Sequence, residues 1–185
     1  MLERARRGDA KAFSEIIRRY EDTVYNFSFS VCRDREYAEE TLQDTFINVY
    51  RKIGQFDGRS KFSTWLYTIV ANNCLMKRRR RKLEAASVSL EDLKGGREDG
   101  SPREHEIQSS RHTPLDEAMS RELRRRLDEA VQKLPVDYRL VFILRDLEGR
   151  SAEETADIMN LKIPAVKSRL HRARRFLREE LREYV

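Results

Sequence analysis

The sequence has few of the residues that break helices or cross-link chains. Its 185 residues include 7 glycines, 4 prolines, 2 cysteines and 1 tryptophan. So little glycine and proline argues against a turn-rich β fold and favours long helices. Cys32 and Cys74 lie far apart in the sequence, each in an apolar helical context, so we do not expect a disulfide framework.

Several kinds of segment and site are also missing. No apolar run approaches the length of a membrane span, and no signal peptide precedes Asp9, so we expect a cytoplasmic protein. His105, His112 and His171 show no metal-ligand spacing with one another or with the cysteines. No nucleophile–base pair, phosphate-binding glycine loop or clustered carboxylate pair indicates an enzyme. We therefore expect no catalytic activity, no cofactor and no metal.

Charge is what the sequence has in abundance. Charged residues make up 38% of the chain, and the net charge of +6 favours a polyanionic partner. The charge is unevenly spread, with a net +7 in residues 1–82 from 18 basic and 11 acidic groups. Residues 83–112 are rich in Ser, Gly, Glu and Asp and lose their apolar periodicity, which predicts a flexible acidic linker.

The stretch from Ser151 to Leu177 predicts two short helices joined by a tight turn. Ser151 is a good N-cap, and Glu154 completes a capping box three residues later. Asn160 tolerates the left-handed backbone of a sharp turn, and Pro164 suits the first turn of the next helix.

The second of these helices has two distinct faces. Four apolar residues share one face: Val166, Leu170, Ala173 and Leu177. Polar and cationic residues project from the other: Lys167, Ser168, His171, Arg172 and Arg175. The pattern is typical of a helix-turn-helix that places its second helix in the major groove of DNA. The alternative is an ordinary helical hairpin with a solvated basic face, and the coincidence of cap, turn residue and basic face favours DNA binding.

Two more helices precede this pair and complete a four-helix C-terminal domain. Thr113 and Pro114 form a helix start, and Pro135 starts the next helix. The expected buried stripe of the first is Leu115, Met119, Leu123, Leu127, Ala130 and Leu134.

The N-terminal part predicts three helices. The first follows the N-cap Asp9 and ends near Cys32, the second runs from Asp34 to about Ile53, and the third opens at Ser63 or Thr64. The expected buried stripe of the second is Ala38, Leu42, Phe46, Val49, Tyr50 and Ile53. Its other face carries Glu36, Glu39, Glu40, Gln43, Asp44 and Asn48. This face is either solvated or a docking surface for a basic partner.

Aromatic residues precede a strongly basic run in the third helix. Phe56, Phe62, Trp65 and Tyr67 come before the run Lys77 to Lys82. Stacking aromatics beside a cationic groove are typical of single-stranded DNA binding. We also expect Trp65 to lie at least partly in the core.

We therefore predict an all-α protein of two small helical domains joined by a flexible linker. The boundaries we expect are residues 1–82, the linker at 83–112 and residues 113–185. We also expect the two domains to move independently.

With both halves considered, the sequence resembles a bacterial RNA polymerase sigma factor of the sigma-70 family, in its extracytoplasmic function (ECF) group. AEETLQDTF (38–46) is similar to the segment that binds core polymerase, and FSTWLYTIVANN (62–73) to the promoter-melting segment. LPVDYRLVFILRDLEGRSAEETADIM, followed by VKSRLHRAR, resembles region 4. The three segments occur in the family's order with a linker between them.

The resemblance implies partners and roles. Core RNA polymerase would bind Glu39, Glu40, Gln43, Asp44 and Asn48. Single-stranded −10 promoter DNA would meet Asp57, Gly58, Arg59, Ser60, Lys61, Asn72, Lys77 and Arg78. Duplex −35 DNA would meet Lys167, Ser168, His171 and Arg172. The family also implies an anti-sigma factor, which would hold the protein at the inner membrane face.

The sequence departs from the family pattern at a few positions. Asn160 stands where the family commonly has Gly, and Lys162 and Pro164 replace a common Pro and Gly, so contacts near the start of the recognition helix are expected to differ. Thr68 stands where the family often has arginine, so no role is carried over to it.

Two other functions stay open on the residues alone. A helix-turn-helix regulator that acts without core polymerase would fit the C-terminal half, but it has no need of the aromatic and basic segment. An enzyme acting on nucleic acid would need the missing carboxylate cluster or nucleotide loop. A requirement for core polymerase separates the three.

Overall fold

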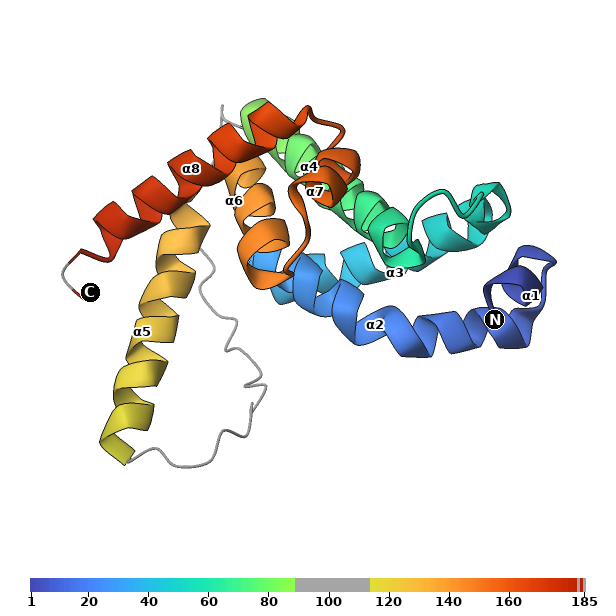
Figure 1. Ribbon diagram of the computed structural model, residues 1–185, viewed down its shortest axis with the longest axis horizontal. Helices are drawn as coiled ribbons and strands as arrows, with labels where there is room; N and C mark the ends of the chain where they lie inside the picture. The colour runs from blue at the N-terminus through green and yellow to red at the C-terminus, as the bar shows by residue number, and fades with distance from the viewer. Residues whose placement is uncertain (89–113, 183, 185) are drawn as a thin grey trace.

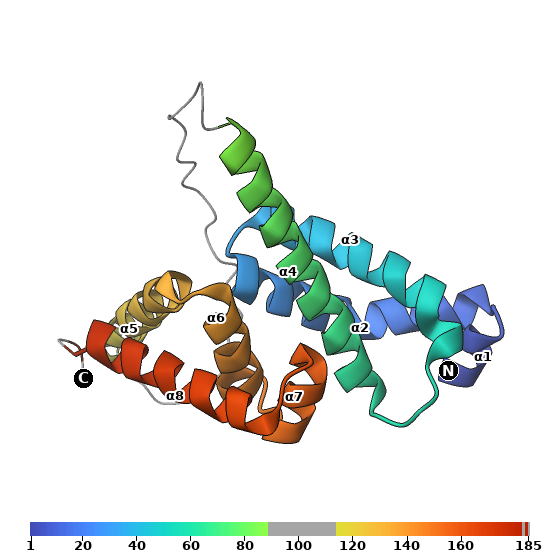
Figure 2. The ribbon, with the colours of Figure 1, turned by 90° about the horizontal axis from the view of Figure 1, so that it is seen from above.

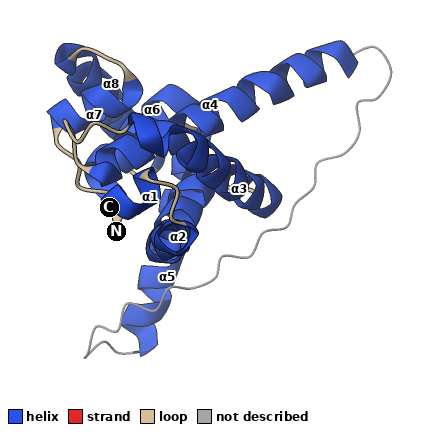
Figure 3. Ribbon diagram, turned by 90° about the vertical axis from the view of Figure 1, so that its right-hand side faces the viewer, coloured by secondary structure: helices blue, strands red, loops and turns tan. Residues whose placement is uncertain are grey.

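In a computed structural model of the chain, every regular element is helical across the residues that the structure describes (Figure 3). The backbone is described for residues 1–88, 114–182 and 184, and side chains are described outside 81–121. No helix within this part has both the length and the apolar character needed to cross a membrane.

The N-terminal domain consists of α1 (Leu2–Arg6), α2 (Ala10–Cys32), α3 (Arg35–Lys52), the short 3₁₀ turn η1 (Ile53–Gln55) and α4 (Phe62–Val88). Helices α2 and α3 pack side by side, and α4 lies across both (Figures 1 and 2). The predicted N-caps are confirmed, because Asp9 accepts from the backbone of Lys11 and Ala12, and Asp34 accepts from Tyr37.

Three predictions for this domain need correction. Helix α4 begins at Phe62 rather than at Ser63 or Thr64, and it continues to Val88, past the residue where the linker was predicted to begin. Tyr50 is 62% exposed instead of buried, and its ring packs edge-on against the partly buried Phe13. The rest of the predicted linker lies outside the described residues.

The C-terminal domain consists of α5 (Pro114–Lys133), α6 (Val136–Phe142), the π-helical turn η2 (Ile143–Leu147), α7 (Ala152–Met159) and α8 (Ile163–Glu180). Helices α6, α7 and α8 form its centre (Figure 1). Among the described side chains, the C-terminal end of α5 packs on them, so Ala130 and the following Leu134 are buried while Leu123 is 43% exposed. The predicted buried stripe of α5 is therefore wrong at Leu123, and the side chains of Leu115 and Met119 lie outside the described residues.

The two domains pack against each other. Leu140, Ile143, Leu144 and Ile158 of the C-terminal domain belong to the apolar core that α2, α3 and α4 build. Helix α7 lies along the first half of α4, as two views show (Figures 1 and 2). The prediction of independently moving domains is at odds with this shared core.

Candidate nucleic-acid interface

The helix-turn-helix has the local structure that its sequence predicts. The Ser151 side chain accepts from the Glu154 backbone at 3.0 Å, and Glu154 Oε2 accepts from the Ser151 backbone at 3.0 Å, so the capping box is complete. Asn160 ends α7 in the left-handed conformation with φ of 50°. Pro164 lies in the first turn of α8, where a missing N–H costs nothing.

Helix α8 exposes one cationic face. Val166, Leu170, Ala173 and Leu177 are buried, as predicted. The −35 candidates Lys167, Ser168, His171 and Arg172 are all exposed on the opposite side, as is Arg175. Arg172 is partly held, since its Nη1 donates to the Tyr138 hydroxyl at 3.3 Å. The face can therefore meet a duplex without rearranging its own helix.

The loop before α4 is exposed and locally ordered by one carboxylate. Asp57 accepts from the Arg59 backbone at 3.1 Å and from the Arg59 side chain. These bonds lower the pKa of Asp57, the backbone bond most, so the carboxylate stays ionised. Gly58 has φ of 76°, a conformation that glycine adopts freely. Gly58, Arg59, Ser60 and Lys61 face solvent, as a loop that captures a base requires.

The two asparagines of α4 have different surroundings. Asn72 is exposed, in keeping with its predicted role in reading a base. Asn73 is buried, where its amide donates to Thr45 Oγ1 at 3.0 Å and its oxygen accepts from Asn48 Nδ2 at 3.1 Å. Asn48 is therefore half-buried and engaged inside the domain, apart from the exposed acids with which it was grouped.

The acidic face of α3 has an internal counter-ion that the sequence did not reveal. Glu39, Glu40, Gln43 and Asp44 are exposed, as predicted. Lys77 of α4, a −10 candidate, places its ammonium 2.8 Å from Glu40 and 3.1 Å from Asp44. Burial lowers the pKa of Lys77, but the two carboxylates together raise it more, so the side chain stays charged. Lys77, predicted to bind −10 DNA, and Glu40 and Asp44, predicted to bind core polymerase, therefore form one ion cluster. The next residue, Arg78, is exposed.

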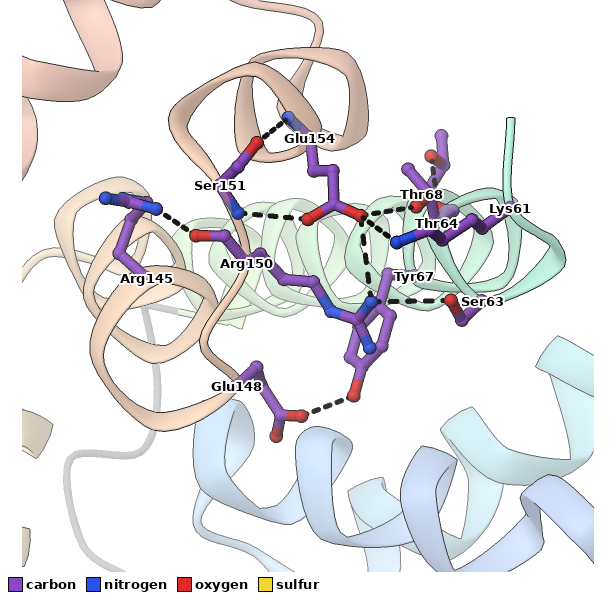
Figure 4. Close-up of polar contacts among 10 residues, drawn as sticks. All are labelled: Lys61, Ser63, Thr64, Tyr67, Thr68, Arg145, Glu148, Arg150, Ser151 and Glu154. Atoms are coloured by element: carbon purple, nitrogen blue, oxygen red, sulfur yellow. Dashed lines mark hydrogen bonds and ion pairs between the residues drawn. The ribbon is translucent and has the colours of Figure 1, made fainter. Parts of the chain in front are cut away.

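Polar contacts between α4 and the C-terminal domain surround Tyr67 (Figure 4). Its hydroxyl donates to Glu148, and the Arg150 guanidinium lies over its ring at 4.6 Å. Arg150 Nη1 also donates to Ser63 Oγ at 3.3 Å. Burial, more than the bond to Glu148, raises the pKa of Tyr67 well above its usual range. Only 3% of Tyr67 is exposed, so Tyr67 cannot stack on a base while the domains are in contact.

Glu154 connects the helix-turn-helix to the start of α4. Its Oε1 accepts from Thr64 Oγ1 at 3.4 Å and lies 4.0 Å from Lys61 Nζ (Figure 4). The hydrogen bond from the Ser151 backbone is the main cause that lowers the pKa of Glu154.

Arg139 anchors the other side of the domain contact. Its Nη1 donates to the Val31 carbonyl at the end of α2 at 2.6 Å, and its Nη2 donates to the Leu134 carbonyl at 3.1 Å. Burial is the main cause that lowers the pKa of Arg139 to about 10, so the side chain remains charged near neutrality. Beside it, Arg33 pairs with Asp128 at 2.7 Å. The sequence did not predict this role of Arg139, because a buried arginine that binds backbone carbonyl groups gives no periodic pattern.

Comparison with known proteins decides the family. Residues 16–84 match Sigma-70 region 2, and residues 124–177 match Sigma-70, region 4. The chain is 32% identical over 186 residues to the ECF RNA polymerase sigma factor SigW of Bacillus subtilis, covering 98% of this chain and 95% of the relative. The chain belongs to the extracytoplasmic function group of the sigma-70 family. It is an alternative sigma factor that directs RNA polymerase to specific promoters, and the resemblance inferred from its motifs is confirmed.

Another relative and two solved structures are also similar to this chain. The RNA polymerase sigma-H factor of Pseudomonas aeruginosa is 32% identical over 177 residues, covering 94% of this chain and 88% of the relative. The sigma factor RpoE of Bartonella quintana, solved with the anti-sigma factor NepR, has a TM-score of 0.72 and 25% identity, and the match covers 94% of this chain and 98% of RpoE. CnrH, solved with the cytosolic domain of CnrY, has the same fold, with a TM-score of 0.65 and 22% identity, covering 98% of this chain and 95% of CnrH.

Proposed function

We propose that this sigma factor binds the −35 duplex through Lys167, Ser168, His171 and Arg172 on α8. The observation that carries the proposal is the exposed face of α8 opposite a fully buried stripe, behind a completed capping box. A recognition helix needs this combination, because base edges in the major groove are reached by side chains held on a rigid scaffold.

The −35 proposal is tested by footprinting holoenzyme on promoter DNA. Alanine at all four positions should abolish −35 protection. A single lost base contact should cost about 1–3 kcal/mol and relax specificity at one position, whereas a lost phosphate contact should weaken binding to every sequence. Arg178→Ala, an exposed arginine further along α8, is the control. Undiminished −35 protection in the fourfold variant would contradict the proposal.

We propose also that residues 57–61 and Asn72 capture the −10 element as single-stranded DNA, with Lys77 and Arg78 holding the backbone. The exposed loop and exposed Asn72 support this role. Strand separation needs a greater affinity for separated strands than for duplex, because only differential affinity shifts an equilibrium. Loop and Asn72 variants should fail in permanganate assays on duplex promoters and be partly rescued by a template mismatched across −10. Equal failure on both templates would show that base capture and melting are not coupled.

The proposed docking surface for core polymerase is the exposed part of α3, namely Glu39, Glu40, Gln43 and Asp44, with Asn48 contributing from its edge. Glu40→Lys combined with Asp44→Lys should weaken pull-down of core polymerase. Run-off transcription that requires core polymerase would exclude a helix-turn-helix regulator acting alone. Unchanged pull-down in the charge-reversal variant would remove α3 from the proposal.

We propose that the protein acts in the cytoplasm, where core polymerase and promoter DNA are found. Because RpoE was solved with the anti-sigma factor NepR, we propose an anti-sigma factor as a further partner, and a membrane-anchored one would hold the protein at the inner membrane face. Co-purification of such a partner from unstressed cells tests this.

A further inference from the structure

Polar side chains hold two consecutive turns of α4 against α3. In the first turn, the buried Asn73 amide donates to Thr45 Oγ1 at 3.0 Å, and its oxygen accepts from Asn48 Nδ2 at 3.1 Å. In the next turn, the Lys77 ammonium lies 2.8 Å and 3.1 Å from two carboxylates of α3. The hydrogen-bonded side chains of Thr45, Asn48 and Asn73 are called the amide clasp below.

The amide clasp lies where α4 leaves the core of its domain. Cys74 is 2% exposed and is the last buried residue of α4 among the described side chains, which extend to Arg80 on this helix. The helix itself continues to Val88, and its end extends past the other helices (Figures 2 and 3). The amide clasp and the Lys77 ion cluster therefore help to fix the direction in which the second half of α4 extends.

The orientation of Asn72 depends on how α4 is rotated against α3. Within residues 69–74, Asn72 is exposed and the other side chains are buried. Successive residues of an α-helix point about 100° apart, so rotation of α4 by a fraction of a turn would move Asn72 from solvent toward a neighbouring helix. Asn73, the next residue, is the one whose hydrogen bonds to α3 oppose such a rotation.

Hydrogen bonds fix a helix rotation more strictly than apolar contacts do. Apolar burial is non-directional, whereas a hydrogen bond requires a donor and an acceptor about 3 Å apart and nearly aligned. A shifted α4 would leave the buried amide of Asn73 and the hydroxyl of Thr45 without each other, and an unpaired buried polar group is costly. The amide clasp therefore favours one arrangement of α4 on α3 over its neighbours.

We propose that Asn73 is a positioning residue for −10 recognition, because the amide clasp fixes α4 so that Asn72 faces the captured base. The inference rests on the role proposed above for Asn72. It also gives Asn48 a function inside the domain, since Asn48 lies on the helix proposed to bind core polymerase and holds the helix proposed to read DNA. Base reading then depends on a hydrogen bond between two residues that are not proposed to touch DNA.

The test measures open-complex formation by holoenzyme, at saturating core polymerase, on promoters that carry each single base substitution in the −10 element. Asn72→Ala should remove discrimination at one position. Asn73→Leu keeps the size of the side chain and loses both hydrogen bonds. It should lower discrimination at that same position by about ten-fold, because a misaligned base contact loses most of the preference that a good one provides. Discrimination at −35 should be unchanged.

The outcomes separate this inference from the proposed −10 role. If Asn72→Ala loses discrimination and Asn73→Leu keeps it, the inference is wrong and the −10 role of Asn72 stands. If Asn72→Ala discriminates like wild type, both are wrong.

Two further variants separate positioning from stability. Val24→Ala leaves a cavity in the same core on α2, so it should lower the urea midpoint and keep wild-type discrimination. The triple variant Thr45→Val, Asn48→Leu, Asn73→Leu should fold about as stably as wild type, because both partners of each hydrogen bond become apolar. It should still discriminate as poorly as Asn73→Leu. Wild-type discrimination in the triple variant, or a loss in Val24→Ala as large as that in Asn73→Leu, would overturn the proposal.

A double-mutant cycle tests the Asn48–Asn73 bond even if the triple variant does not fold. Asn48→Ala should lose discrimination at the position that Asn72 reads. The variant that combines Asn48→Ala with Asn73→Ala should be no worse than Asn73→Ala alone, because one broken bond cannot be broken again. Full discrimination in Asn48→Ala, or losses that multiply in the double variant, would overturn the proposal.

Discussion

Glu154 takes part both in the local N-cap of α7 and in a contact with α4 of the other domain. Its carboxylate accepts from the Ser151 backbone, and this bond is the main cause that lowers its pKa below 4.5. A carboxyl whose folded pKa is depressed stabilises the fold above its unfolded pKa and loses that contribution as pH falls through the folded pKa.

The C-terminal domain should therefore lose stability as pH falls below about 4.5. Glu154→Gln keeps an acceptor for the Ser151 backbone but cannot titrate, so its urea midpoint should change less with pH than that of wild type. Urea titrations at pH 7 and pH 4, followed by circular dichroism, give the difference. Asp157→Asn, an exposed acid on the same helix, is the control. Equal pH dependence of wild type and Glu154→Gln would exclude a role for this carboxylate.

At the scale of elements, the ion cluster between α3 and α4 links two proposed surfaces. Lys77 neutralises part of the charge that Glu40 and Asp44 present. A basic partner that docks on α3 must share these acids with Lys77 or displace it, and displacement would free the ammonium for DNA phosphate.

Lys77→Gln should accordingly tighten the binding of core polymerase by about two- to five-fold at low salt, because two carboxylates lose their counter-ion and exposed ion pairs contribute up to about 1 kcal/mol. Lys77→Arg should bind like wild type. Arg79→Gln, which removes an exposed cation two residues further on, should leave core affinity nearly unchanged. Fluorescence anisotropy with labelled core at two salt concentrations measures this. The same affinity for Lys77→Gln and Arg79→Gln would show that the pairing does not restrain α3.

Elements with periodic or capped sequences were predictable, and contacts between distant elements were not. The caps at Asp9, Asp34 and Ser151 depend on neighbouring residues, so the sequence contained the whole signal. Tyr50 and Leu123 were assigned to buried stripes because periodicity identifies a helix face but not where its packing partner ends. The −10, −35 and core-binding residues were proposed from motifs, and their roles stay predictions.

At the scale of the whole molecule, region 4 packs on α4 of region 2, the helix proposed to take part in promoter melting. The contact joins apolar residues of α6, η2 and α7 to the N-terminal core and adds the polar group around Tyr67. In this closed arrangement Tyr67 is buried, so stacking of a base on Tyr67 would require the domains to separate. The sequence could not show this, because no local pattern records which surfaces meet across a linker.

Arg150→Ala should shift free protein toward the open arrangement. The substitution removes the cation–π contact with Tyr67 and the bond to Ser63, and a cation–π contact is worth about 0.5–2 kcal/mol, so the open population should rise roughly two- to thirty-fold. Small-angle X-ray scattering should show a larger radius of gyration. Limited proteolysis should cut faster between residues 87 and 111.

The control is Arg175→Ala, which removes an exposed arginine that pairs only within α8, with Glu179 at 3.7 Å, among the contacts described. Tyr67→Phe tests the same contact from the other side, since it removes the hydroxyl that binds Glu148 and keeps the ring. If Arg150→Ala and Arg175→Ala scatter alike, the polar group around Tyr67 does not hold the domains together.

The two oxygens of the Glu154 carboxylate serve different partners. Oε2 completes the cap of α7, and Oε1 faces Thr64 and Lys61 across the domain contact. When the domains part, Oε1 exchanges its partners for water while the cap stays intact. The helix-turn-helix would then be released already folded, so the speed of promoter engagement would be set by how fast the domains separate and not by any refolding of the DNA-binding module.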